Sequence, residues 1–325
     1  MPNLAWAARA NRQRVLRADL LLLVAALVWG FGFVAQRVGT EVIPPFSFNA
    51  IRFAMGAVLL APLIFMRGQR RSSVDRDSPR QLDSPRQLDS PRQRVLLTSA
   101  DFRLKLVLWG GGAVAGLLVA VAVNFQQFGI ATTTAGKAGF ITGMYMILVP
   151  FLGFFVRHRP GWGSWIGALI SALGLFFLSV GSDFTIAPGD LLLLACAVTF
   201  AFQVLLVGWL SPRCDPLQLA WVEFFFCAVF CAIGALLFEH ITWQAVSDGL
   251  VPLLYSGIAS VAIGYTLQVV GQRDANPTHA SILMNMEAVF AALGGWLILG
   301  EVLSGRALLG CALMFVGMLL AQLKP

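Results

Sequence analysis

Three ionisable side chains interrupt long apolar stretches of this sequence: Arg52, Glu223 and Glu287. If those stretches cross a membrane, a charged group inside them is costly, and such groups normally face the protein interior and serve a function. Three interpretations stay open. Arg52 and one glutamate form a static buried ion pair, or a glutamate carries a proton because a low dielectric disfavours its charged form, or one of the three contacts a charged substrate.

Uncharged polar residues surround these charges at helical spacing. Interhelical hydrogen bonding without any transport role would explain each of them taken alone, and a tryptophan in a span is often a packing or interface residue. Their joint distribution over most of the apolar stretches instead indicates a central polar cavity. The predicted cavity residues are Trp29, Asn49, Arg52, Asn124, Gln127, Tyr145, Gln203, Glu223, Tyr265, Gln268, Asn285 and Glu287.

The composition indicates a membrane protein. Of the 325 residues, 58% are hydrophobic and only 12% are charged, and the mean hydropathy is +0.78. A soluble protein carries about twice this charged fraction, and the apolar stretches here approach the ~20 residues with which a helix spans a bilayer. They lack the period-two alternation of barrel strands. We therefore expect an all-α integral membrane protein without a soluble domain.

Ten apolar stretches can be drawn, separated by turn sequences such as IPPF, RHRPG, APGD and DANP. Asp190, Asp215 and Asn276 are placed to cap the helices that follow them. The predicted spans are Leu20–Ala35, Phe46–Met66, Leu104–Phe128, Ala138–Val156, Ser164–Val180, Asp190–Leu210, Pro216–Phe238, Leu250–Val270, His279–Leu299 and Leu303–Gln322.

The lysines and arginines orient these ten spans. With the N-terminus in the cytoplasm, only Arg37, Lys137 and Arg306 of the 23 basic residues lie outside, and Arg52 lies within a span. The other basic residues are then cytoplasmic, as the positive-inside rule requires, so both termini are predicted to be cytoplasmic. The net charge of +7 therefore reflects topology and does not indicate nucleic-acid binding.

The same orientation gives the depth of the three charges in the membrane. At about 1.5 Å per residue, Arg52 lies roughly 9 Å from the outer edge of its span, and Glu223 and Glu287 lie roughly 10 and 12 Å from the inner edge. In a hydrocarbon core about 30 Å thick, the two glutamates share a depth. A long arginine side chain on a tilted helix could reach one of them.

The chain contains a weak internal repeat. Residues 131–157 can be laid over 275–301, and each segment is followed by a short loop and a glycine-punctuated final helix. Each half then holds five spans, so the second half enters the membrane from the opposite side. Such inverted repeats are typical of alternating-access transporters, although duplication that only enlarges a scaffold would leave the same pattern. The predicted units are 20–180 and 190–322, after a basic cytoplasmic tail at 1–19.

The cytoplasmic loop predicted at 67–103 contains three copies of a hexamer, DSPRQLDSPRQLDSPRQR, from Asp77 to Arg94. Each copy is polar and carries a proline, so the segment is predicted to be disordered. The neighbouring Arg67, Arg70 and Arg71 suit a lipid-headgroup-binding arm. A tandem expansion that is tolerated in a loop is the simpler interpretation.

Three segments carry a family signature: LLLLVAALVWGFGFVAQRVG, NAIRFAMGAVLLAPL and ASILMNMEAVFAALGGWLILGEVLSGRALLGCALMFVGMLL. They resemble the EamA-type transporters of the drug/metabolite transporter superfamily, as two tandem units over about 20–322. The most recognisable piece is an acidic residue before a glycine run and G-E, which here are Glu287, Gly294, Gly295, Gly300 and Glu301. The first half departs from this pattern, because Gly143 and Arg157 stand where the two glutamates are expected. The resemblance implies a ten-helix carrier of the bacterial inner membrane, with a central cavity between helices 1–4 and 6–9.

Other function classes lack support in the sequence. There is no H-E-x-x-H or G-x-S-x-G motif, and the three histidines are scattered, so we expect no metal site, no cofactor, no ATP-binding domain and no enzyme activity. The predicted function is a secondary active exporter or exchanger of small metabolites or amphipathic compounds, working by alternating access, with proton coupling left open. The alternative is an intramembrane enzyme acting on a lipid or a lipid-linked substrate. The expected partners are a small solute and the lipid bilayer.

Overall fold

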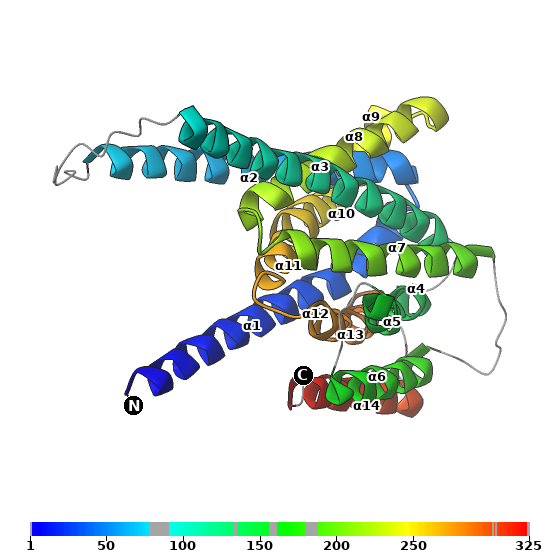
Figure 1. The fold of residues 1–325 in the computed structure, drawn as a ribbon. Coiled ribbons are helices and arrows are strands. Elements are labelled where there is room, and N and C mark those ends of the chain that lie inside the picture. Colours follow the sequence, from blue (N-terminus) through cyan, green and yellow to red (C-terminus); the bar gives the residue numbers. More distant parts are fainter. Residues whose placement is uncertain are drawn as a thin grey trace.

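The computed structural model describes residues 2–77, 91–132, 135–155, 161–179, 188–300, 302 and 304–323, and every regular element in them is a helix (Figure 1). The elements are, in chain order, α1 (Pro2–Gly39), α2 (Pro45–Asp77), α3 (Pro91–Ile130), α4 (Ala135–Gly143), α5 (Tyr145–Phe155), α6 (Trp162–Ser179), α7 (Pro188–Leu210), α8 (Pro216–Phe238), α9 (Trp243–Asp248), α10 (Leu250–Leu254), the π-helix η1 (Tyr255–Tyr265), α11 (Thr266–Gly271), α12 (Pro277–Met284), α13 (Glu287–Leu299) and α14 (Gly305–Leu323).

Several helix ends follow directly from the sequence. Asp215 precedes α8, where its carboxylate accepts hydrogen bonds from the Leu217 and Gln218 amides at 3.1 and 3.2 Å. Asn276 caps α12 in the same way through the Thr278 amide at 3.0 Å. Asp190 instead lies in the first turn of α7, because that helix already begins at Pro188. Its carboxylate there favours the helix through the macrodipole.

Within the described residues, seven helices are long and apolar enough to cross a membrane. They are Gln13–Gly39, Pro45–Met66, Lys105–Ile130, Pro188–Leu210, Pro216–Phe238, Leu250–Gly271 and Pro277–Leu299. Three shorter apolar helices, Ala138–Phe154, Trp162–Phe177 and Leu308–Leu320, overlap the remaining predicted spans. The chain is thus a multi-pass helical membrane protein.

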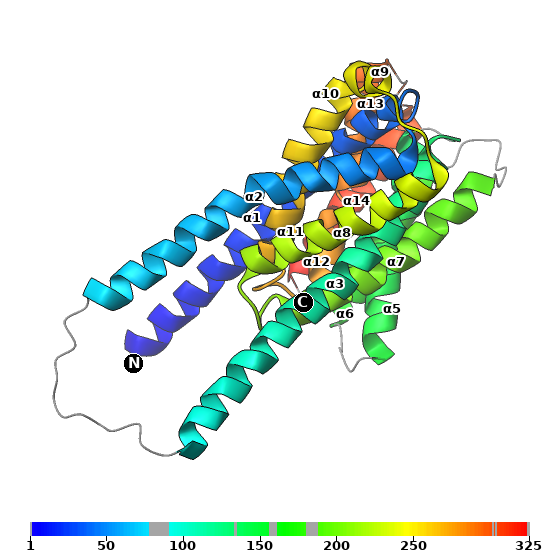
Figure 2. The same ribbon diagram turned by 90° about the horizontal axis from the view of Figure 1, so that it is seen from above.

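The predicted loop at 67–103 needs a correction. Helix α2 continues to Asp77 and α3 already begins at Pro91, so only 78–90 separate them, and most of the hexamer repeat lies in that stretch, outside the described residues. Hydropathy marks where a chain leaves the membrane, whereas a helix propagates onward through residues such as arginine and glutamine at little cost. The extended ends of α1, α2 and α3 project from the same end of the bundle (Figure 2).

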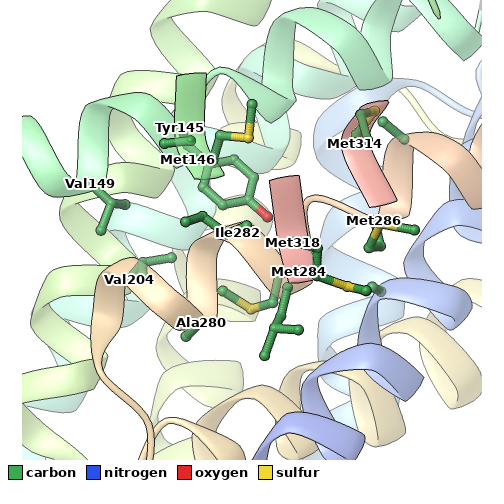
Figure 3. Packing of buried hydrophobic residues seen from close by; sticks show 14 of the residues in the cluster. Tyr145, Met146, Val149, Val204, Ala280, Ile282, Met284, Met286, Met314 and Met318 are labelled. Carbon is green, nitrogen blue, oxygen red and sulfur yellow. The ribbon is translucent and has the colours of Figure 1, made fainter. Parts of the chain in front are cut away.

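The helices form a central group with one pair at its edge. Helices α2, α3, α7 and α8 pack against one another, and α1 packs against α13 and η1. Helices α6 and α14 lie side by side at the edge of the bundle, next to α4, α5 and α12 (Figure 1). A methionine-rich core cluster, which includes Met146, Met284 and Met314, joins this pair to the centre (Figure 3).

Two predicted spans are interrupted in the structure. The fourth breaks at Met144, between α4 and α5, and the ninth breaks at Asn285 and Met286, between α12 and α13. Both breaks are tight turns with i→i−3 bonds, from the Met144 amide to the Ile141 carbonyl and from the Met286 amide to the Leu283 carbonyl, each 3.2 Å. The eighth span contains η1, a further departure from regular α-helix. Hydropathy predicts none of these irregularities, because apolar content continues through them.

Candidate functional site

A polar cavity lies inside the apolar bundle, with about 470 Å³ of space between its lining atoms, a figure that includes the part open to solvent. Helices from both halves of the chain line it, and no lining residue comes from α6 or α14. The lining residues are Trp29, Phe33, Gln36, Arg52, Gln126, Tyr145, Phe200, Gln203, Val204, Ser260, Tyr265, Gln268, Met284 and Glu287. Aromatic rings therefore form much of its wall. The charged residues Arg52 and Glu287 and several glutamine side chains supply the polar groups of that wall.

Seven of the predicted cavity residues line this space: Trp29, Arg52, Tyr145, Gln203, Tyr265, Gln268 and Glu287. The other five, Asn49, Asn124, Gln127, Glu223 and Asn285, are buried but do not line it. Trp29 shows how the wall is held, because its indole N–H donates to the Ser260 carbonyl oxygen at 3.1 Å and its ring packs 4.8 Å from that of Tyr265.

Glu287 and Tyr145 form the acidic part of the cavity. The Tyr145 hydroxyl donates a hydrogen bond to the Glu287 carboxylate. Glu287 is the first residue of α13 and Tyr145 is the first residue of α5, so both side chains are positioned by the helix breaks. Discontinuous helices of this kind place helix ends and their partial charges near bound solutes in known carriers.

A chain of amides connects the cavity to the second glutamate. Gln268 donates to the Gln203 side-chain oxygen at 3.2 Å, and Gln203 donates to the Glu223 carboxylate at 2.8 Å. Glu223 is fully buried behind the wall, and its second carboxylate oxygen has no hydrogen-bond partner. The three side chains come from α11, α7 and α8. Glu223 can therefore influence the cavity through Gln203, without touching its contents.

Arg52 corrects one of the sequence interpretations, because it forms no ion pair with Glu223 or Glu287. Each glutamate is instead hydrogen-bonded to a neutral side chain, Gln203 or Tyr145. The Arg52 guanidinium is 1% exposed, and its Nε and one terminal nitrogen have no hydrogen-bond partner. Its carbon lies 5.7 and 5.2 Å from the ring centroids of Phe48 and Phe53. A buried cation needs a partner anion, and this one faces a cavity.

The polar residues near Arg52 mainly connect helices. The Asn49 amide donates to Asn124 at 3.0 Å and to the Val123 carbonyl oxygen at 3.2 Å, which joins α2 to α3. Gln127 donates to the Gln36 carbonyl oxygen at 3.3 Å and joins α3 to α1. These contacts agree with the simpler interpretation of these residues, interhelical hydrogen bonding.

The two broken spans cross at Asn285. Its amide donates to the Met146 sulfur at 2.8 Å, across from α5. A Cβ atom on Gly143 would lie only 2.2 Å from the Asn285 side-chain oxygen, so any larger residue at this crossing requires the Asn285 side chain to move. This explains why Gly143 stands where the repeat would place a second glutamate. Glu301 and Arg157, the other pair in that comparison, lie outside the described residues.

Several cavity residues were missed from the sequence. The sequence does not distinguish an apolar residue that lines a cavity from one that packs between helices. This applies to Phe33, Phe200, Val204 and Met284. Gln36 and Gln126 are polar and could have been found, but a one-residue error in helix phase favoured Gln127 over Gln126. A further polar contact was also missed: His279 on α12 lies 2.9 Å from Asp19 on α1, and both are buried.

Comparisons with known proteins agree with this architecture. The model of the EamA-like transporter family matches residues 16–180 and 187–323. An uncharacterized transporter of Archaeoglobus fulgidus is 26% identical over 95% of this chain and 87% of its own. The threonine/homoserine exporter RhtA of Salmonella typhimurium is 27% identical over 51% of this chain and 57% of its own. A solved crystal structure superposes with a TM-score of 0.70 at 21% identity, over 94% of this chain and 96% of its own.

Proposed function

The chain belongs to the EamA-like transporter family, and from this premise we propose that it is a secondary carrier that exports or exchanges a small solute by alternating access. The observation that carries the proposal is the buried cavity, which both halves of the chain line with polar groups inside an otherwise apolar bundle. A non-transporting scaffold has no need to bury an unpaired arginine in such a space.

The proposed topology has ten spans, arranged as two inverted units at 20–180 and 190–322, with both termini in the cytoplasm. The seven long and three shorter apolar helices support the number of spans, and the two consecutive family matches support the duplication. The two broken spans occupy corresponding places in the two units, which also supports an inverted repeat. The membrane is proposed to be the inner membrane of a bacterial cell.

The cavity favours a solute that has an anionic group and a hydrogen-bond donor. Arg52 offers unpartnered guanidinium N–H groups, which suit a carboxylate because the planar fork matches its two oxygens. Glu287 and Tyr145 offer acceptors for an ammonium or hydroxyl group. The aromatic side chains of Trp29 and Phe200 suit an amphipathic body between them. One relative is a threonine/homoserine exporter, so threonine is the first solute to test.

Transport can be tested by counterflow in proteoliposomes. Vesicles loaded with unlabelled threonine and diluted into labelled threonine should accumulate label transiently, and Arg52→Gln should abolish that accumulation. Arg52→Lys should retain part of it, because the charge stays while the fork is lost. Glu41→Gln is the matched control, since its side chain is 65% exposed. Absence of counterflow with threonine and with a panel of amino acids and other carboxylate metabolites would contradict the proposal.

Proton coupling through the two glutamates is a separate part of the proposal. Each carboxylate has a neutral hydrogen-bond partner whose arrangement must change when the carboxylate gains a proton, and Tyr145 comes from the other half of the chain. Export by Glu287→Gln and Glu223→Gln should therefore lose its dependence on an imposed pH gradient while solute exchange persists. If both variants keep the wild-type dependence, these glutamates do not couple transport to protons.

A further inference from the structure

A buried polar contact between Asp19 and His279 joins the two halves of the chain outside the transport cavity. Asp19 lies on α1 and His279 lies on α12, and these two helices are side by side (Figure 1). The His279 Nε2 atom is 2.9 Å from an Asp19 carboxylate oxygen, and both side chains are buried. Under the proposed topology, the contact lies at the cytoplasmic end of both helices.

An apolar layer separates this contact from the transport cavity. Four buried side chains of one core cluster lie along α1 and α12 between the contact and the cavity: Leu22, Ala26, Ile282 and Leu283. Beyond this layer, Trp29 of α1 and Met284 of α12 line the cavity. A solute can therefore pass between these helices to the cytoplasm only after they separate.

The contact has the chemistry of a bond that can be broken and reformed. When α1 and α12 separate, water hydrates the Asp19 carboxylate and the His279 imidazole, and this hydration offsets most of the hydrogen bond that is lost. An apolar contact has no such compensation. In addition, α12 ends at the helix break of Asn285 and Met286, where it can turn relative to α13.

The internal repeat places a second aspartate at the corresponding point of the other half. Asp19 begins the sequence DLLLL at 19–23, and Asp190 begins the same sequence at 190–194. Asp190 is also buried, in the first turn of α7. Because the two units are proposed to be inverted, Asp190 lies at the outer end. Alternating access closes the two ends of a carrier in turn, by movement of one repeat against the other, so we expect a closing contact at each end.

We propose that the contact between Asp19 and His279 is the latch of the cytoplasmic gate. It holds α1 against α12 while the cavity is closed to the cytoplasm, and it breaks when the cavity opens to that side. Both are positioning residues, since neither lines the cavity. The inference rests on the proposed alternating-access function, and it predicts that removal of either side chain favours the inward-open state.

The test measures access to the cavity from each face of the membrane. A reporter cysteine, Met284→Cys, reacts with a membrane-impermeant methanethiosulfonate reagent in inside-out and right-side-out vesicles. The same protein without the reporter gives the background from the five native cysteines. When Asp19→Ala or His279→Ala is added, labelling from the cytoplasmic face should rise about fivefold or more, because the lost hydrogen bond stabilises only the closed state. Labelling from the outer face should not rise.

Asp190→Ala is the matched control, because it removes the same side chain from the corresponding place in the other unit. It should not raise labelling from the cytoplasmic face. A rise on both faces would indicate a general loss of packing and would overturn the latch. An unchanged rate in the two latch variants, or an equal rise in Asp190→Ala, would also overturn it. Labelling requires no solute, so failure of the proposed function is detected separately, as absent threonine counterflow in the wild type.

Discussion

The crossing of the two broken spans predicts the effect of a single added methyl group. In Gly143→Ala, the new Cβ would lie 2.2 Å from the Asn285 side-chain oxygen and 3.3 Å from its Cγ, so the Asn285 amide must rotate away. Overpacking of this kind costs about 1–3 kcal/mol, and loss of the 2.8 Å hydrogen bond to Met146 adds about 0.5–1.5 kcal/mol. Removing a helical glycine recovers about 0.5–1 kcal/mol.

The net expectation is a destabilisation of about 2 kcal/mol, which for a chain of 325 residues corresponds to a fall of about 3 °C in the thermal unfolding midpoint. Gly139→Ala, one turn earlier in α4, is the matched control. A Cβ atom there would have its nearest neighbours at 3.8 Å, an ordinary contact distance. That variant should unfold at the wild-type midpoint or slightly above it, because the same methyl group fits and the glycine entropy is removed.

A double substitution identifies the contact responsible. In Gly143→Ala with Asn285→Ala, the added methyl occupies space that the amide has left, so the double variant should be more stable than the two single effects predict by at least about 1 kcal/mol. Unfolding is followed in detergent by tryptophan fluorescence. Additive effects, or a Gly143→Ala midpoint equal to that of Gly139→Ala, would refute the reasoning from the crossing.

Three further predictions concern the ends of the spans. Glu239 accepts hydrogen bonds from the Phe46 amide and from the Ser47 amide and hydroxyl at 2.7–2.8 Å. Glu239→Ala should therefore lower the free energy of unfolding by about 1–3 kcal/mol. An unchanged unfolding midpoint would contradict this expectation. Asp19→Ala should cost about 1–3 kcal/mol because it leaves the buried His279 imidazole without its partner, and adding His279→Ala should recover part of that loss in the same assay. Burial raises the pKa of the Cys214 thiol, so less thiolate is present at neutral pH. Maleimide should therefore react more slowly with Cys214 than it does with the thiol of glutathione, and the rate for Cys214 should keep rising to a higher pH. Equal pH profiles for the two thiols would contradict the expectation.

The sequence by itself determined the class of the protein and most of its polar inventory. Three features depend only on the composition along the chain: the apolar stretches of spanning length, the helix breakers between them and the distribution of arginines. A hydropathy profile and a count of basic residues therefore detect them directly. The charges Arg52, Glu223 and Glu287 were conspicuous for the same reason. Gly143 was noted as a departure from the repeat, but nothing local to the chain explained it.

Only the tertiary structure decided which of these groups meet. In the structure Arg52 has no carboxylate partner, Glu223 is hydrogen-bonded to Gln203, and Glu287 is hydrogen-bonded to Tyr145. Gln126, rather than Gln127, lines the cavity. The tertiary structure also placed the helix breaks that bring Tyr145 and Glu287 together. Such pairings depend on the rotation and crossing of helices that are distant in sequence. Successive residues of an α-helix point about 100° apart around its axis. The composition of one segment does not indicate which of these directions faces the cavity.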